Sequence, residues 1–213
     1  MPKILIAVPC MDSTPVEFTH SLASLNKIGE CVLAMRSGSL VYTSREGLAA
    51  EAIRRGADYI MWLDSDIMFG ADTLQRLFDD IQKAGDGVIM TGVYYRRQTP
   101  FSPVVYSKLE IDKDRATWQE IEDVPDDLFE VAGCGFGCVL APTSAFVDVM
   151  AKFGTMFNPI GGTGEDLAFC WRARQCGWRF IADPSIWLGH VSKQVISANY
   201  WQEYKQYKKD GSK

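Results

Sequence analysis

The sequence contains no apolar run of the roughly 18 residues that a bilayer span needs, and the short apolar segment of residues 3–8 is too brief for a signal-peptide core with a cleavage site. We therefore expect a cytoplasmic protein with no membrane span. Basic charge is also scarce, because 22 lysines and arginines stand against 27 aspartates and glutamates, for a net charge of -5. Phosphate backbones and anionic lipids attract clusters of lysine and arginine, so the composition argues against nucleic acid as a partner.

The chain has few cysteines and histidines, the residues that bind zinc in zinc fingers. The chain has six cysteines and two histidines, and only Cys134 and Cys138 lie close together in a pattern that invites comparison with a metal site. A zinc site would need two further ligands nearby, and His20 and His190 are not spaced to supply them. We expect the cysteines to be reduced thiols in a chain large enough to fold without disulfides.

Length and composition favour one folded domain. The chain has 213 residues, of which 47% are hydrophobic and 23% are charged, values close to those of an average globular protein. No internal repeat and no linker divides it. We expect one domain over residues 1–195, followed by a C-terminal helical tail over residues 196–213.

Strand-like and helix-like segments alternate through the first half of the chain. The segment Asp58–Leu63 is continuously apolar, which is typical of a strand buried on both faces of a parallel sheet. The alternation predicts an α/β fold with a Rossmann-like, mostly parallel sheet and helices on both faces. The expected strands are Lys3–Val8, Cys31–Met35, Asp58–Leu63 and Gly87–Thr91, and the expected helices are Val16–Lys27, a segment around Leu48 that Gly56 ends, and Ala71–Phe78.

The second half of the chain is less regular. Residues 98–127 are rich in proline and charge, so we expect a hairpin-like insertion or an acceptor-side loop there. Just before them, Tyr94-Tyr95-Arg96-Arg97 follows the fourth strand, either as a solvated loop or as a segment that binds donor or acceptor. Beyond the insertion the sequence predicts strands over residues 131–141, 178–182 and 186–190, and helices over residues 143–152 and 165–176.

Two acids, Asp64 and Asp66, follow the apolar strand directly. Ligands of open α/β sheets bind in the crevice beyond the carboxyl ends of the strands. In an extended segment, residues two apart face the same side, so both carboxylates can converge on one divalent cation, or on a cation and a ribose hydroxyl. By itself the motif is equally compatible with a turn of solvated aspartates.

Two later motifs carry further candidate groups. A glycine-rich loop, Gly161 to Gly164, leads into Glu165 and Asp166 at the start of an amphipathic helix. Acids at a helix N-terminus offset the helix dipole without any catalytic role, but the glycines also let a ligand approach the backbone. His190 ends an apolar run, and although a lone histidine is more often a core or surface residue, imidazole is a common nitrogen ligand of ions such as Mn²⁺.

These pieces together resemble a known family. Asp64-Ser65-Asp66 after YIMWL, the strand from Gly133 to Pro142, the segment GEDLAFCWRARQCGWRFIADPS and then His190 follow the order seen in GT-A glycosyltransferases, most closely those of family 2. The resemblance covers residues 3–191. Two features depart from the family: the chain lacks the membrane-associating carboxyl extension of many relatives, and residues 98–127 match nothing in it, which leaves the acceptor unassigned.

The resemblance implies a nucleotide and metal site. Asp66 resembles the direct metal ligand and His190 the carboxyl-terminal one, with diphosphate oxygens and water completing the site around Mn²⁺ or Mg²⁺. Asp64 would contact the ribose, or the metal through water. Arg45, in an arginine-containing turn after the second strand, and Pro9, in the loop that seats the base and ribose, are candidates to contact the nucleotide.

The implied reaction moves a sugar from a nucleoside diphosphate sugar to a hydroxyl of a glycan, protein or small-molecule acceptor. Asp166 resembles the catalytic base of an inverting reaction, and Glu165 its neighbour that orients the acceptor. A retaining reaction stays open, because Trp187 to Val191 also resembles the histidine segment of retaining polypeptide GalNAc-transferases.

Two other classes of protein share this kind of sheet. A nucleotidyltransferase would need a glycine-rich, basic first loop, whereas VPCMDSTPVEF has neither glycine nor a basic residue. A fold-mate that binds a sugar or a partner protein without turnover would be expected to lose an acid or the histidine, and both are present.

Overall fold

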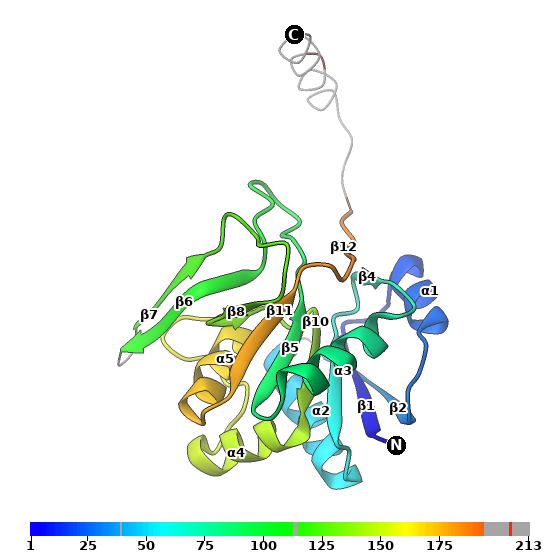
Figure 1. The fold of residues 1–213 in the computed structure, drawn as a ribbon, viewed down its shortest axis with the longest axis horizontal. Coiled ribbons are helices and arrows are strands. Elements are labelled where there is room, and N and C mark those ends of the chain that lie inside the picture. The colour runs from blue at the N-terminus through cyan, green and yellow to red at the C-terminus, as the bar shows by residue number, and fades with distance from the viewer. Residues whose placement is uncertain (39, 113–114, 194–204, 206–213) are drawn as a thin grey trace.

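A computed structural model describes residues 1–38, 40–112, 115–193 and Lys205, and Figure 1 shows the chain as an α/β structure. The central sheet contains β1 (Lys3–Cys10), β2 (Glu30–Ser37), β3 (Tyr59–Leu63), β5 (Val88–Gly92), β8 (Phe129–Val131), β10 (Cys138–Pro142) and β11 (Arg179–Asp183). The helices of the described ranges are α1 (Val16–Ser24), α2 (Val41–Arg55), α3 (Thr73–Ala84), α4 (Thr143–Phe153) and α5 (Glu165–Gln175). Two smaller sheets join β4 (Ile67–Phe69) to β12 (Leu188–His190), and β7 (Arg115–Glu120) to β6 (Val105–Asp112) and β9 (Gly133–Cys134).

The central sheet is mostly parallel. Its strand order is β2-β1-β3-β10-β5-β11-β8, and strands β1, β2, β3, β5 and β11 run in one direction while β10 and β8 run in the other. This arrangement confirms the predicted α/β fold class with a mostly parallel sheet. The parallel strands bring their carboxyl ends to one edge, where crevices for ligands form in sheets of this kind.

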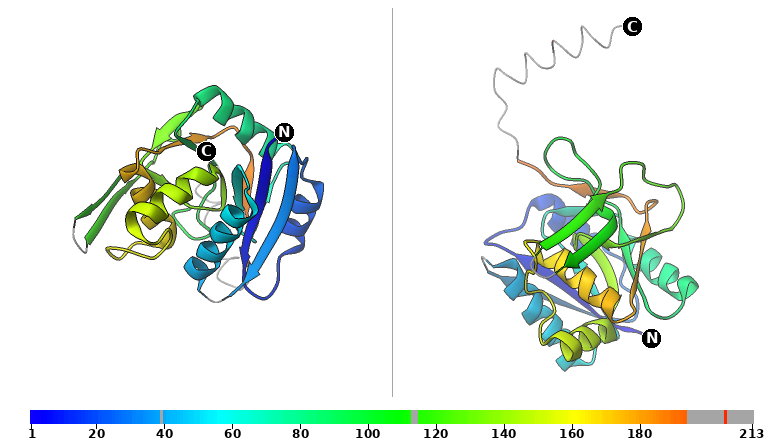
Figure 2. Two further views of the ribbon diagram at one scale, coloured as in Figure 1. Left: turned by 90° about the horizontal axis from the view of Figure 1, so that it is seen from below. Right: turned by 90° about the vertical axis from the view of Figure 1, so that its left-hand side faces the viewer.

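Helices cover both faces of the sheet (Figures 1 and 2). On one face α2, α4 and α5 enclose a core that is unusually aromatic, in which Trp62 contacts the rings of Phe136, Phe146 and Phe157. On the other face α1 and α3 pack on a second cluster of buried side chains, most of which are aliphatic. Strand β3 contributes alternate residues to both clusters, which explains why its sequence is apolar throughout.

Local sequence signals explain where several elements end. Helix α2 ends at Gly56, whose φ of 65° is left-handed and whose amide binds the carbonyl oxygens of Ala52 and Ile53. Glycine adopts this backbone conformation without the steric cost that other residues meet. The sequence placed the end of this helix correctly.

The glycine-rich stretch of residues 131–141 is not the single strand that we predicted. It divides into β8, β9 and β10, each in a different pairing. The chain crosses close beneath Tyr94 between β9 and β10, where a Cβ at Gly137 would lie 2.8 Å from the tyrosine ring. Such a close approach breaks the strand and explains why glycine is used there.

The insertion at residues 98–127 contains the antiparallel hairpin of β6 and β7, which projects beyond the central sheet in Figure 1. The expected tail helix over residues 196–213 lies outside the described residues, apart from Lys205. Within the described ranges, none of the helices has both the length and the apolar character that crossing a membrane requires.

Candidate functional site

The candidate site lies at the carboxyl edge of the sheet and begins where β3 ends. Asp64-Ser65-Asp66 forms a tight turn, closed by a hydrogen bond from the Ile67 amide to the Asp64 carbonyl oxygen at 3.1 Å. The turn leads into β4, which pairs antiparallel with β12 so that His190 lies opposite Ile67. The imidazole Nε2 of His190 is consequently 3.6 Å from Oδ2 of Asp66. The structure thus brings together two predicted metal ligands that are far apart in the sequence.

The ring of His190 is held in one orientation. Its Nδ1 is 2.8 Å from the carbonyl oxygen of Tyr95, and because a carbonyl oxygen only accepts, Nδ1 carries the hydrogen. Nε2 is therefore the atom that faces Asp66. The ring of Tyr94 also packs edge-on against this imidazole, with 5.4 Å between centroids.

Asp66 and His190 stabilise each other's charged forms. Burial alone would lower the pKa of His190, but its contacts with Asp66 and the Tyr95 carbonyl outweigh burial and raise this pKa. Burial alone would raise the pKa of Asp66, but the contacts with His190 and the charge of Arg97 lower it. The pair is therefore an ion pair over a wider pH range than either group alone would suggest.

Arg97 is a second cationic partner of Asp66. Its Nη1 is 2.8 Å from Oδ2 of Asp66, and half of its side chain is exposed. The sequence left the segment of residues 94–97 open between a solvated loop and a ligand-binding segment. The structure shows Arg97 bound to Asp66, the second acid of the Asp64-Ser65-Asp66 motif.

Arg45 differs from the sequence expectation. It does not lie in a turn after the second strand but near the beginning of α2, and its side chain is buried. Nη2 is 2.7 Å from Oδ1 of Asp64, Nε is 3.2 Å from Oε1 of Glu165, and only 3% of the side chain is exposed. The guanidinium lies over the rings of Trp62 and Phe136, so it is enclosed by aromatic and acidic groups. Arg45 belongs to the helix because α2 starts at Val41, earlier than the hydrophobic spacing alone predicted.

One guanidinium nitrogen of Arg45 has no partner among the described residues. Nη1 is buried and forms no hydrogen bond there. A buried donor without an acceptor is uncommon in a folded protein, and such a donor at the base of a cavity is suited to a ligand oxygen or a water molecule.

Glu165 and Asp166 occupy the first turn of α5, directly after Gly164. Burial raises the pKa of Asp166 to about 6, and the neighbouring charge of Glu165 adds to this effect. Arg45 opposes the shift but does not cancel it. A carboxyl group with this pKa loses and accepts protons close to neutral pH, which is the property that a general base requires.

A cavity of about 220 Å³ connects most of these residues. It brings together five of the residues predicted from the sequence: Pro9, Arg45, Asp64, Asp66 and Glu165. Cys10, Met11, Gly38, Val41, Ser44 and Ser65 complete its lining. Asp166 and His190 do not line the cavity. His190 contacts Asp66, which does line it, and Asp166 directly follows Glu165, which also lines it.

The donor set suits a cation that takes only two ligands from the protein. Asp66 Oδ2 and His190 Nε2 face each other, with the half-exposed Arg97 also on Oδ2, whereas Asp64 is bound to the buried Arg45. No three His, Cys, Asp or Glu side chains in the described ranges are placed to hold one metal ion together. Mg²⁺ and Mn²⁺ commonly take their other ligands from substrate phosphates and water, so a two-ligand set fits such a site.

Glu46 supports the site in a way that sequence reasoning missed. Its Oε1 accepts hydrogen bonds from Thr155 Oγ1 and from the amides of Met156 and Phe157, at 2.6, 2.7 and 2.7 Å. These contacts tie α2 to the loop that leads toward Glu165. No local pattern signals them, because the partners are more than 100 residues away in the chain.

Comparison with solved structures supports the fold. The structure of A197 from STIV matches with a TM-score of 0.63 and 20% sequence identity, covering 90% of this chain and 86% of that one. The structure of GalNAc-T7 with UDP, GalNAc and Mn²⁺ matches with a TM-score of 0.63 and 12% identity, covering 91% of this chain and 44% of that one.

This chain therefore spans less than half of GalNAc-T7. Searches with protein-family models and among curated proteins return no match. At these identities the likeness is one of fold: the chain has an α/β fold similar to that of a GT-A glycosyltransferase.

Proposed function

We propose that this protein is a glycosyltransferase of the family 2 type that moves a sugar from a nucleoside diphosphate sugar to an acceptor hydroxyl. The observation that carries the proposal is the meeting of Asp66 and His190, 3.6 Å apart, at the carboxyl edge of the sheet. Pairing of β4 with β12 brings them together from distant positions in the sequence. The resemblance to GalNAc-T7, whose structure contains UDP, GalNAc and Mn²⁺, supports the same class of donor and metal.

Asp66 and His190 would hold Mn²⁺ or Mg²⁺, with diphosphate oxygens and water as the remaining ligands. When bound, the ion neutralises the charge that develops on the departing diphosphate, an effect worth several kcal/mol. His190 is prepared for this role because its Nδ1 hydrogen is committed to the Tyr95 carbonyl oxygen, which leaves Nε2 toward the site.

The donor nucleoside is proposed to occupy the cavity lined by Pro9 and Cys10. Asp64 lies in the same cavity and is held in place by Arg45, so its free oxygen is suited to a ribose hydroxyl. Arg45 would thereby act on the nucleotide through Asp64, as a positioning residue.

Asp166 is the proposed general base of an inverting reaction, taking the proton of the acceptor hydroxyl as the new glycosidic bond forms. Its pKa of about 6 leaves it ionised at neutral pH while it still binds a proton effectively. Glu165 is held by Arg45 and would orient the acceptor. A retaining reaction is the alternative, and the anomeric configuration of the product, determined by NMR, distinguishes the two.

One observation favours a second candidate function, a protein that binds nucleotides or sugars without turnover. Arg45 and Arg97 already neutralise Asp64 and Asp66, so the acids do not depend on a metal ion for charge balance. Binding of donor in the absence of added metal, with no hydrolysis or transfer, would favour this candidate.

The deciding experiment is a hydrolysis and binding panel of nucleoside diphosphate sugars with Mn²⁺ or Mg²⁺. We expect wild type to hydrolyse at least one donor slowly, Asp66→Ala to lose metal-dependent donor binding, and Asp166→Asn to bind donor but not transfer it. Asp79→Ala, which removes an exposed carboxylate of α3, serves as the matched control. If wild type neither cleaves any donor nor shows metal-dependent nucleotide binding in thermal shift, the proposal fails.

A further inference from the structure

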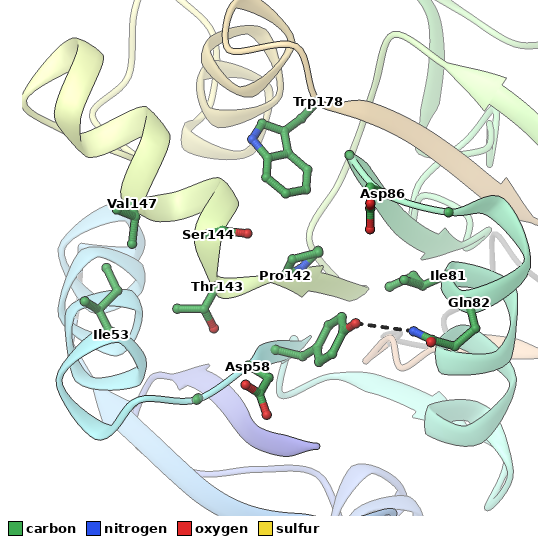
Figure 3. A pocket seen from close by; sticks show the side chains of 14 residues that line it. Ile53, Asp58, Ile81, Gln82, Asp86, Pro142, Thr143, Ser144, Val147 and Trp178 are labelled. Carbon is green, nitrogen blue, oxygen red and sulfur yellow. Dashed lines mark hydrogen bonds between the residues drawn. The ribbon is translucent and has the colours of Figure 1, made fainter. Parts of the chain in front are cut away.

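A second and larger cavity lies at the opposite edge of the central sheet. Its volume is about 670 Å³, within the range of roughly 300 to 1,000 Å³ that is usual for small-molecule sites. It lies between the start of β3, the end of β10, the start of α4 and the turn from α3 to β5 (Figure 3). Asp58 at this cavity and Asp64 at the candidate site flank β3, so about 20 Å of extended chain separates them. The two cavities are therefore separate.

Two aromatic side chains in the lining are fixed in orientation. The indole Nε1 of Trp178 donates to Oδ2 of Asp148 at 3.0 Å, and in Figure 3 the ring points into the cavity. Tyr59 accepts a hydrogen bond from Gln82 at 3.3 Å and packs edge-on against Phe78. Rigid aromatic rings offer flat apolar contact area at a low cost in conformational entropy.

The charged groups of the lining are all acidic. Asp58 and Asp86 line the cavity, and none of the lysines and arginines that the structure describes does. Asp58 accepts a hydrogen bond from the Lys3 amide at 2.7 Å, while the carboxylate of Asp86 points into the cavity in Figure 3. An anionic ligand would be repelled, whereas ligand hydroxyl groups would find strong acceptors.

The opposite wall offers donors. Helix α4 begins there without a side-chain cap, and the N-terminus of a helix carries positive potential that disfavours a cation. Thr143, the first residue of α4, is only 7% exposed, and its hydroxyl has no hydrogen-bond partner in the described part of the chain. Ser144 lies beside it and points into the cavity in Figure 3.

We propose that this cavity binds a neutral carbohydrate. A sugar has apolar C–H faces that pack on Trp178 and Tyr59, and hydroxyl groups that donate to Asp86 and accept from the α4 end of the cavity. Anions fit less well, since the two carboxylates repel them, and the combination of acceptors on one wall with donors on the other suits hydroxyl groups better than a simple cation, which would leave the donors unused. This inference does not depend on the proposed catalytic function, because the site lies on the other edge of the sheet.

Saturation-transfer NMR with a panel of neutral mono- and oligosaccharides tests the proposal, with spermidine and inorganic phosphate as charged probes. We expect at least one saccharide to bind wild type, and Trp178→Ala and Asp86→Asn each to weaken that binding by about tenfold. Asp79→Asn, which changes an exposed carboxylate of α3 outside the cavity, is the matched control for Asp86→Asn and should leave binding unchanged.

Asp86 lies in an exposed turn, so Asp86→Asn keeps the test decisive if Trp178→Ala fails to fold. Absence of saccharide binding to wild type, or binding unaffected by Asp86→Asn, would overturn the proposal. Preferential binding of spermidine or phosphate would overturn it as well. Loss of donor hydrolysis with saccharide binding at this cavity intact would count against the proposed transferase alone.

Discussion

At the scale of single residues, Arg45 connects the end of β3 to the start of α5. Its buried guanidinium bonds to Asp64 and Glu165 and lies over the rings of Trp62 and Phe136. Removing one member of a buried charge network leaves the others without compensation, which is far more costly than breaking an exposed ion pair.

Replacing Arg45 by methionine should therefore lower the free energy of unfolding by about 3 kcal/mol. Arg55→Met is the matched control, because it breaks an exposed pair with Glu51 within α2 and should cost less than about 1 kcal/mol. Urea denaturation of the two variants measures the difference. Equal losses would contradict the idea that Arg45 organises the site.

Asp166 gives a prediction about pH. Its pKa in the folded protein, about 6, lies above the value of an unstructured aspartate, so the folded state binds this proton more tightly than the unfolded state. Stability contributed by the protonated group is present at about pH 4 and is lost as the pH rises through about 6. Asp166→Asn should consequently be more stable than wild type at pH 7.5 by about 2 kcal/mol, with the two converging near pH 4.

Urea denaturation at both pH values tests this difference, and a gap that does not change with pH would contradict it. The same variant should show no sugar transfer while keeping its affinity for the donor. In wild type, kcat/KM should rise with pH through about 6 and then level off, since the base acts in its ionised form.

At the scale of elements, the sequence predicted what depends on local pattern. The apolar run of β3 and the glycine that ends α2 were both placed correctly. Burial on two faces requires apolar residues throughout a strand, and a left-handed backbone favours glycine, so both features can be recognised in the sequence. The direction of β10 was not predictable in this way. An apolar strand has the same composition whether it runs parallel or antiparallel to its neighbours.

The sequence named acids and a histidine that the structure brings close together, but it did not reveal the contacts that hold them. Asp66 and His190 were named through motif order, whereas the bond from Arg97 to Asp66 and the three bonds to Glu46 were not. Each of these contacts joins side chains whose proximity follows from tertiary packing. The spacing of residues along the sequence does not indicate which side chains become neighbours in this way.

The loop before α5 supplies a prediction about neighbouring glycines. Gly161 and Gly162 both have left-handed backbones, with φ values of 62° and 80°. A Cβ at Gly161 would lie 2.9 Å from the Ala116 amide nitrogen of β7, whereas one at Gly162 meets nothing within 4 Å. Gly162→Ala should therefore cost only the conformational strain, about 1 to 2 kcal/mol.

Gly161→Ala should cost more, because it also displaces β7 and weakens the hydrogen bond from the Ala116 amide to the Gly161 carbonyl oxygen. Since this loop leads into Glu165 and Asp166, the same variant should also reduce donor hydrolysis. Thermal denaturation and the hydrolysis assay measure the two effects. Similar behaviour of the two alanine variants would show that the hairpin does not constrain this loop.

At the scale of the whole molecule, β12 is attached to the body through its short pairing with β4 and through His190. A ligand that binds across Asp66 and His190 stabilises the folded arrangement by an amount that grows with the logarithm of its concentration above Kd. We expect Mn²⁺ added together with UDP to slow amide hydrogen exchange in β4 and β12, with little change in the distant edge strand β2. Asp66→Ala should abolish the effect, and uniform protection of all strands would contradict it.

The central position of β10 has a consequence for synthesis on the ribosome. Strands β3 and β5 do not pair with each other, because β10 lies between them and supplies the hydrogen bonds of both inner edges. A nascent chain that has not yet reached Cys138 exposes the inner edge of the fully apolar β3 and both edges of β5, whose other neighbour, β11, follows later still. Open edges of this kind invite association between chains. The growing polypeptide is thus most in need of chaperone protection after β5 has emerged and before β10 follows it.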